Sequence, residues 1–326
     1  MLHNHINRIN HQYIALFLLM ILLTACQPAA APATPARAPS AAPEVAVTDL
    51  PTTIPATATA APSPTPTIHT VCGQSQPLFI LGLGVDDHEQ ADAIRLIRVD
   101  FLTGRVLVLS FPRDTWLPIT GLADEGITEG RINATYGYGE TFNGPGKGAD
   151  LLADTLNRNY GVTFDRWFSA HFSLFVNYID SLGGVDIDLA QPIGGYGFKG
   201  KLHLNGREAL VYVRQRANDS DLYRIQRQAE VMKGLFRKLS QPQSITALPE
   251  LAASLLDEHT FLTNLTAADV ASLVCLAAAL REEDIVFLDI PPEYVPGVET
   301  ATGAFIRIPA PEISDFIRKA YINGEY

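Results

Sequence analysis

The 326-residue chain has few cysteines, a deficit of positive charge and no long hydrophobic run. Three cysteines are too few for a disulfide-rich scaffold or a four-thiolate zinc site, but they can form one disulfide with one thiol left over. Lysine and arginine number 24 against 35 aspartates and glutamates, which gives a net charge of -11. A bulk basic nucleic-acid binder is therefore disfavoured, and no nucleic-acid partner is expected.

Several common catalytic motifs are also missing. A dinucleotide-binding fingerprint begun by Gly82 and Gly84 needs its third glycine at position 87, which is Asp87. Lys147 lies in a glycine-rich stretch, but the next residue is Gly148 rather than the serine or threonine of a phosphate-binding loop. The eight histidines show no metal-ligand spacing, and no Gly-x-Ser-x-Gly elbow is present.

The N-terminus contains an export signal. A polar lead with Arg8 precedes the wholly apolar run 14–23, and ten such residues are too few to span a bilayer but match a signal-peptide core. The run ends in Leu23-Thr24-Ala25-Cys26, which resembles a bacterial lipobox. We therefore expect residues 1–26 to be a lipoprotein signal peptide with Cys26 as the lipidated residue, an ordinary cleaved signal or a short anchor being the alternative.

Residues 27–70 read as a linker, and residues 71–326 as the folded part. The linker holds ten of the chain's 22 prolines, with alanine and threonine filling most of the rest, so it cannot bury a core and favours extended segments. This organisation predicts an extracytoplasmic, membrane-anchored domain. Outside the cytoplasm thiols are often paired, so we expect a Cys72–Cys275 disulfide. The alternative is one exposed thiol and one buried thiol, since Cys275 lies in an apolar run.

The folded part mixes strand and helix patterns. Apolar runs predict strands at 78–85, 93–100 and 106–111, and their short connections predict an antiparallel meander. Such a meander brings Asp86, Asp87, Asp92 and Arg113 to one edge of the sheet. The other expected elements are helices at 148–160, 173–182, 205–214, 221–239 and 310–321, two helices within 246–281 that separate near residue 263, and strands at 166–172, 185–189 and 284–290.

These elements predict a single α/β domain, with a mixed central sheet flanked by helices. The strand, helix and strand over 166–189 read as a βαβ-like crossover.

Positive charge gathers in one window of this acidic chain. Ten basic and four acidic residues lie between Lys199 and Lys238. Arginine predominates in the centre of the window, and its planar fork suits phosphate oxygens. The window therefore predicts an anion site, although a solvated helix face is the usual meaning of such a run.

Eight ordered motifs make the chain resemble the LytR–CpsA–Psr family of bacterial cell-envelope enzymes. They lie at residues 81–92, 110–115, 131–134, 136–139, 181–186, 203–209, 213–216 and 221–228. The resemblance implies a LytR–CpsA–Psr-type catalytic domain over 71–326. It also implies a phosphotransferase that moves a glycopolymer from a polyprenyl-pyrophosphate carrier to peptidoglycan in cell wall assembly.

The resemblance carries specific roles onto this sequence. Asp86 and Asp92 are expected to hold Mg²⁺, and Asp219 or Asp221 to orient arginines or assist the acceptor hydroxyl. The expected phosphate contacts are Arg113, Arg214, Arg216, Arg224, Arg227 and Gln228. The residues expected to be catalytic are Arg113, Arg224 and Arg227, together with Asp219 and Asp221. The carrier's tail needs an apolar pocket, to which Phe172, Phe175 and Ile179 are candidate contributors.

Two positions depart from the family pattern. His88 and Gln90 stand where the family usually has arginine, which weakens two phosphate contacts. Two alternatives to the transferase therefore stay open. One is a pyrophosphatase acting on polyprenyl or nucleotide pyrophosphates, and the other is a non-catalytic lipoprotein that binds polyprenyl phosphate or glycan.

Overall fold

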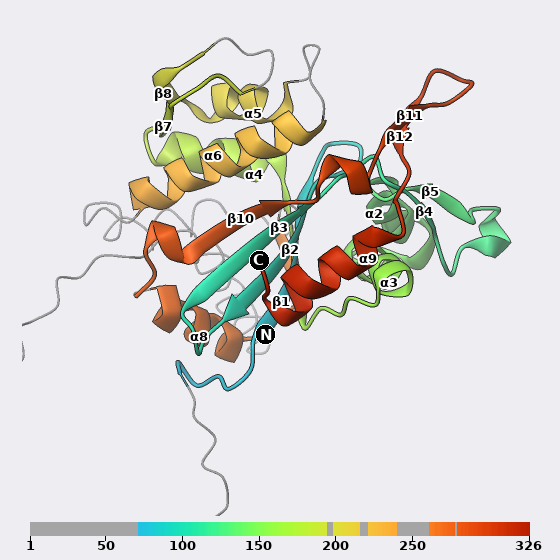
Figure 1. Ribbon diagram of the computed structural model, residues 1–326, viewed down its shortest axis with the longest axis horizontal. Coiled ribbons are helices and arrows are strands. Elements are labelled where there is room, and N and C mark those ends of the chain that lie inside the picture. The colour runs from blue at the N-terminus through green and yellow to red at the C-terminus, as the bar shows by residue number, and fades with distance from the viewer. Residues whose placement is uncertain (1–70, 194–197, 216–220, 240–260, 278) are drawn as a thin grey trace, which may run out of the picture. The chain divides into compact units, whose positions relative to one another are not determined.

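The computed structural model describes residues 71–193, 198–215, 221–239, 261–277 and 279–326, all within one compact unit. At its centre lies a six-stranded sheet in the order β10-β3-β2-β1-β6-β9 (Figure 1). The strands are β1 (Leu78–Val85), β2 (Ala91–Asp100), β3 (Arg105–Phe111), β6 (Arg166–His171), β9 (Phe261–Thr263) and β10 (Ile285–Asp289). β1 runs parallel to β6 and β3 parallel to β10, while the other neighbours are antiparallel. The predicted mixed α/β fold and the β1–β2–β3 meander are confirmed.

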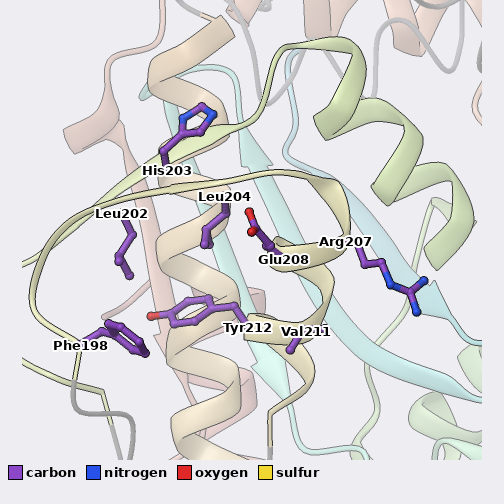
Figure 2. A pocket seen from close by; sticks show the side chains of 8 residues that line it. All are labelled: Phe198, Leu202, His203, Leu204, Arg207, Glu208, Val211 and Tyr212. Atoms are coloured by element: carbon purple, nitrogen blue, oxygen red, sulfur yellow. The ribbon is translucent and has the colours of Figure 1, made fainter.

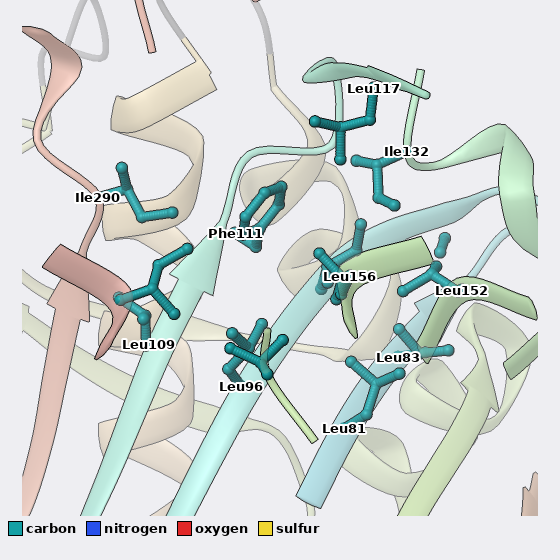
Figure 3. Packing of buried hydrophobic residues seen from close by; sticks show 14 of the residues in the cluster. Leu81, Leu83, Leu96, Leu109, Phe111, Leu117, Ile132, Leu152, Leu156 and Ile290 are labelled. Atoms are coloured by element: carbon teal, nitrogen blue, oxygen red, sulfur yellow. The ribbon is translucent and has the colours of Figure 1, made fainter. Parts of the chain in front are cut away.

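The first face of the sheet packs on α3 (Gly148–Tyr160) and α9 (Glu312–Ile317). Leu81 and Leu83 of β1 and Leu96 of β2 lie here against Leu152 and Leu156 of α3 (Figure 3). All five are at most 2% exposed, and burying each such side chain contributes about 2 kcal/mol. Because the opposite face is covered as well, the strands read as nearly continuous apolar runs rather than as alternating ones.

The second face packs on α8 (Ala267–Ala277), which a disulfide joins to the start of the domain. The predicted Cys72–Cys275 bond is present, with 5.5 Å between the two Cα atoms. Beside it the Gln74 side-chain amide donates to the Ser272 hydroxyl at 3.0 Å. The entry of the chain into the domain is thus fixed to this helix.

The start of α8 is held by the carboxylate of Asp269. It accepts from the Thr266 amide at 2.8 Å and from the Arg166 Nε at 2.5 Å, while its own amide donates to the Thr266 hydroxyl. Burial acts to raise the pKa of Asp269, but the hydrogen bonds from Thr266 and Arg166 outweigh it and hold that pKa below its usual value.

A third apolar cluster joins three helices to a separate hairpin. The elements are α4 (Phe172–Ser181), α5 (Gly206–Arg214), α6 (Asp221–Leu239), β7 (Val185–Leu189) and β8 (Gly200–Leu204). β7 pairs with β8 and not with the central sheet, so the predicted βαβ-like crossover is wrong. The reason is its one-sided pattern, in which Val185, Ile187 and Leu189 are buried while the intervening aspartates are exposed. Such a strand needs one helical layer, and α6 supplies it.

Shorter elements complete the described chain. They are β4 (Trp116–Pro118), β5 (Glu129–Arg131), α2 (Ala134–Tyr138), β11 (Gly297–Glu299), β12 (Phe305–Arg307) and single turns of 3₁₀ or π type. The predicted helix 310–321 is α9 followed by a π turn to Asn323. Of the two helices expected within 246–281, the second is α8 and the first lies outside the described residues. Within the described ranges, no helix combines the length and apolarity needed to cross a membrane.

Candidate functional site

The loop between β1 and β2 presents two carboxylates at the sheet edge. Asp86 follows β1, and its Oδ1 accepts from the His88 amide at 2.9 Å and the Gln90 amide at 3.0 Å. Asp92 is the second residue of β2, and both aspartates are 7% exposed. The two backbone amides thus hold Oδ1 of Asp86, and Oδ2 is left to interact with other groups.

Glu89 closes this loop in a strained conformation. Its φ of 55° lies in the left-handed region, which is unusual for a side chain other than glycine or asparagine. Burial raises the pKa of Glu89, while His171, whose Nε2 lies 4.0 Å from its carboxylate, opposes that rise. A Cβ at Gly137 would come within 2.9 Å of the Glu89 carbonyl oxygen, so α2 packs tightly under the loop.

The loop after β3 brings Arg113 to the same edge, as predicted. Its Nη1 pairs with Asp92 Oδ1, and its Nε lies 3.7 Å from Asp114 Oδ2. The carbonyl of Arg113 accepts from the Asn133 amide at 3.2 Å, and the Asn133 side chain donates to Gln90 at 2.9 Å. Arg113 and the carboxylates therefore form one connected network.

Arg214, the last residue of α5, reaches across to both carboxylates. Its Nη2 lies 3.9 Å from Asp86 Oδ2 and 3.9 Å from Asp92 Oδ2. The guanidinium also stacks on the Phe172 ring, 5.1 Å from its centroid. The side chain is 44% exposed, so the arginine lies at the mouth of the site.

This arrangement fits a divalent cation of the Mg²⁺ type. One oxygen of each aspartate lies near the same positively charged nitrogen of Arg214. A cation bound by both carboxylates would take the place of this nitrogen. Mg²⁺ is usually held by one or two carboxylates together with substrate phosphates. Among the described residues no group of three or more histidine, cysteine or acidic side chains could hold a metal ion, so a cation here would depend on the two aspartates together with substrate oxygens.

The predicted phosphate residues of α6 face inward. Arg224 is 4% and Arg227 is 0% exposed. Arg227 donates to three backbone carbonyls, those of Tyr212 at 3.2 Å, Ile193 at 3.3 Å and Gln215 at 2.5 Å. Two of these acceptors belong to or follow the last turn of α5, where a cation also complements the helix dipole. In this structure Arg227 holds in place the helix end that carries Arg214, and its predicted phosphate contact stays a prediction.

Gln228 meets a residue that the sequence analysis missed. Its Oε1 accepts from Nη2 of Arg95, a β2 residue only 7% exposed. The signal was a charged residue in alternation with Ile97 and Val99, which places Arg95 on the same apolar side of the strand as these two residues.

Some predicted residues lie outside the description. Cys26, Arg216 and Asp219 fall in undescribed segments, and of Asp221 only the backbone at the start of α6 is described. Their roles stay predictions.

Part of the charge in the described stretch of the basic window is paired with nearby acids. Lys233 pairs with Glu230 at 2.8 Å and Arg237 with Glu282 at 2.9 Å. Of the described arginines in the window, Arg214 contacts the aspartates directly.

Apolar surface lies on two sides of α5. On the sheet side, a Cβ at Gly84 would come 3.2 Å from the Phe172 ring, which shows how closely that ring covers the strand beside Arg214. Ile179 is fully buried core, and Phe175 packs against the same cluster. A pocket of about 300 Å³ lies between β8 and α5, and Figure 2 shows the side chains that line it. Its lining residues are Phe198, Leu202, His203, Leu204, Arg207, Glu208, Val211 and Tyr212.

Comparison with known proteins identifies the family. The sequence model of the LytR_cpsA_psr family matches residues 53–316. The chain belongs to the LytR–CpsA–Psr family. It is 31% identical over 202 residues to the polyisoprenyl-teichoic acid–peptidoglycan teichoic acid transferase TagU of Bacillus subtilis strain 168. The matched region covers 59% of this chain and 61% of the relative. The chain thus spans about three fifths of the length of the curated relatives it matches.

Solved LytR–CpsA–Psr structures share the fold. TagV of B. subtilis superposes with a TM-score of 0.61 at 23% identity, covering 77% of this chain and 97% of that one. TagT bound to LIIa-WTA gives a TM-score of 0.59 at 23% identity, covering 79% and 94%.

Proposed function

We propose that the protein is an extracytoplasmic transferase that moves a glycopolymer from a polyprenyl-pyrophosphate carrier to peptidoglycan. One observation carries the proposal: Asp86 and Asp92 converge on Arg214, with Arg113 paired to the second carboxylate. Carboxylates and arginines mixed at one sheet edge suit a diphosphate whose charge must be neutralised while a P–O bond breaks. Membership of the family and the similarity to TagU support the same activity.

The residues of the site have different roles in the proposed reaction. An acceptor hydroxyl oxygen on peptidoglycan attacks the phosphorus that carries the glycan, and the bond from that phosphorus to the bridging oxygen breaks. The products are a phosphodiester and polyprenyl phosphate, and the hydroxyl proton leaves to a base. Arg113 and Arg214 would bind the phosphate oxygens and stabilise the charge that develops on them. Mg²⁺ held by Asp86 and Asp92 would supply Lewis-acid polarisation.

The surroundings of Arg214 favour a lipid-linked anion over a soluble one. Phe172 stacks on the arginine and lies on the glycine-lined part of β1, so an apolar floor adjoins the proposed phosphate position. An isoprenoid chain joined to the pyrophosphate would extend from the charged edge along this apolar surface. The predicted lipidation of Cys26 would keep the domain at the membrane that holds such a carrier.

A binding protein is the second candidate. His88 and Gln90 replace two arginines of the family pattern, and Gln90 is held by the Asn133 amide rather than by a charged partner. A site with fewer cations binds pyrophosphate but stabilises a transition state less well.

The test uses the full chain, a polyprenyl-pyrophosphate glycan and peptidoglycan fragments, with products followed by mass spectrometry. The proposal expects a Mg²⁺-dependent phosphodiester adduct and its loss in Asp92→Asn. Free phosphate alone indicates the pyrophosphatase, and tight binding without turnover indicates the binding protein. Either result overturns the transferase.

A further inference from the structure

A row of polar side chains crosses three strands of the central sheet. Arg95 of β2 is directly opposite Ser110 of β3, and Ser110 is directly opposite Asp289 of β10. Neighbours at one level of a sheet share a face, so the three side chains lie side by side. Arg95 and Ser110 are buried, at 7% and 2% exposed. A buried cation in the middle of a strand is unusual and needs partners on every side.

Asp289 is the acidic member of the row. Burial raises the pKa of Asp289, while the Ser110 hydroxyl and the charges of Arg95 and Lys233 act to lower it. At its other end Arg95 donates through Nη1 to the Ile94 carbonyl at 3.2 Å and through Nη2 to Gln228 Oε1. The guanidinium is therefore fixed from the strand side and turned toward α6.

The chemistry of the Arg95–Gln228 contact determines the orientation of the Gln228 amide. A guanidinium has donors and no acceptor, so the glutamine atom that faces it is the carbonyl oxygen. The NH₂ group lies in the same plane on the other side of the Cδ atom and therefore points away from Arg95. None of the described residues accepts a hydrogen bond from Gln228 Nε2. Gln228 also lies one turn after Arg224 on α6, so the two side chains are neighbours on one helix face.

We propose that Arg95 is a positioning residue that fixes the Gln228 amide with its NH₂ toward a phosphate oxygen of the substrate. This inference rests on the proposed function, because it needs a phosphorylated ligand at the Asp86–Arg214 edge. Without Arg95 the Gln228 side chain samples several rotamers and both amide orientations, and an orientation that turns the oxygen to the anion repels the ligand. Arg95 excludes that orientation without touching the substrate itself.

The experiment measures the Kd of farnesyl pyrophosphate with Mg²⁺ by calorimetry on the full chain. Arg95→Met keeps the length of the side chain but removes its donors, and it should weaken binding about tenfold. Gln228→Ala should weaken binding by a similar factor, and the double variant should be no worse than Gln228→Ala alone. Arg95→Lys, which still donates, should restore most of the affinity.

Two further variants separate positioning from folding. Arg98→Met is the matched control, since Arg98 lies on the same strand but bonds the C-terminal segment through the Ile322 carbonyl, and it should leave the Kd unchanged. Gln228→Glu leaves Arg95 intact and keeps an oxygen on it, but it turns a second oxygen to the phosphate. It should fold as well as wild type and bind at least tenfold more weakly.

The outcomes distinguish this inference from the function on which it rests. An unchanged Kd in Arg95→Met or in Gln228→Glu overturns the positioning role. Additive losses in the double variant overturn it too, because they mean that Arg95 contacts the ligand directly. If wild type does not bind farnesyl pyrophosphate, or Arg113→Ala binds it equally well, the proposed function fails together with the inference.

Discussion

Arg227 is the residue for which sequence and structure give opposite predictions. The family resemblance makes it a phosphate contact, whose loss should reduce turnover by orders of magnitude. In the structure it is fully buried and donates to the carbonyls of Tyr212, Ile193 and Gln215. Replacement by methionine keeps the side chain's length and leaves those three acceptors without this donor.

The magnitude follows from the number of acceptors. A buried polar group left without its hydrogen bond costs about 1–3 kcal/mol, and partial relaxation keeps the total for three such groups near 3–5 kcal/mol. For a domain of this size, that lowers the Tm by about 10 °C. Turnover should also fall, because α5 loses the group that holds the end carrying Arg214.

The assay is urea unfolding of the full chain, followed by tryptophan fluorescence and circular dichroism. Arg237→Met is the control, because Arg237 lies on the same helix, is 40% exposed and pairs with Glu282 at the surface. It should change stability by less than about 1 kcal/mol. Wild-type stability in Arg227→Met together with lost pyrophosphate binding would refute the structural role and restore the phosphate contact.

Three further predictions address the fold around the site. Replacing Cys72 and Cys275 by serine opens a loop of 203 residues and should lower the free energy of unfolding by about 3–5 kcal/mol; equal urea midpoints for both proteins would contradict this. Gly137→Ala places a methyl group against the Glu89 carbonyl and should raise the Kd for pyrophosphate ligands several-fold, an effect absent if the loop adapts. The pKa of Asp269 is lowered, so its ionised form stabilises the fold above the unfolded-state pKa of about 3.9 and the stabilisation is lost as pH falls through the folded-state value. Asp269→Asn should therefore be less stable than wild type at pH 7, and the difference should shrink at acid pH; a constant difference would show that the charge is irrelevant.

The sheet edge was predictable because local patterns determine it. Three apolar runs with short connections favour a meander, and a meander places the end of its first strand, the start of its second and the end of its third at one edge. Asp86, Asp92 and Arg113 follow from that geometry alone. Their spacing along the chain therefore predicted their proximity, and the structure confirms it.

The inward side of α6 was not predictable from its own periodicity. The apolar stripe showed which side packs, but not that backbone carbonyls of another segment lie beside its polar border. Arg227 is placed at that border by the sequence and is buried only because α5 ends there. For the same reason, the pattern of β7 gave its strand character without its partner, and the hairpin with β8 replaced the expected crossover.

The disulfide also determines where mechanical load enters the domain. All 70 residues that precede the described structure join it just before Cys72, so a pull on that leader arrives at this residue. Without the bond to Cys275, the force would next act on β1, a central strand whose end carries Asp86. With the bond, tension passes through a covalent link into α8 and the opposite face of the sheet. If Cys26 is lipidated as the sequence predicts, the disulfide keeps tension from that end of the chain off the strand that precedes Asp86.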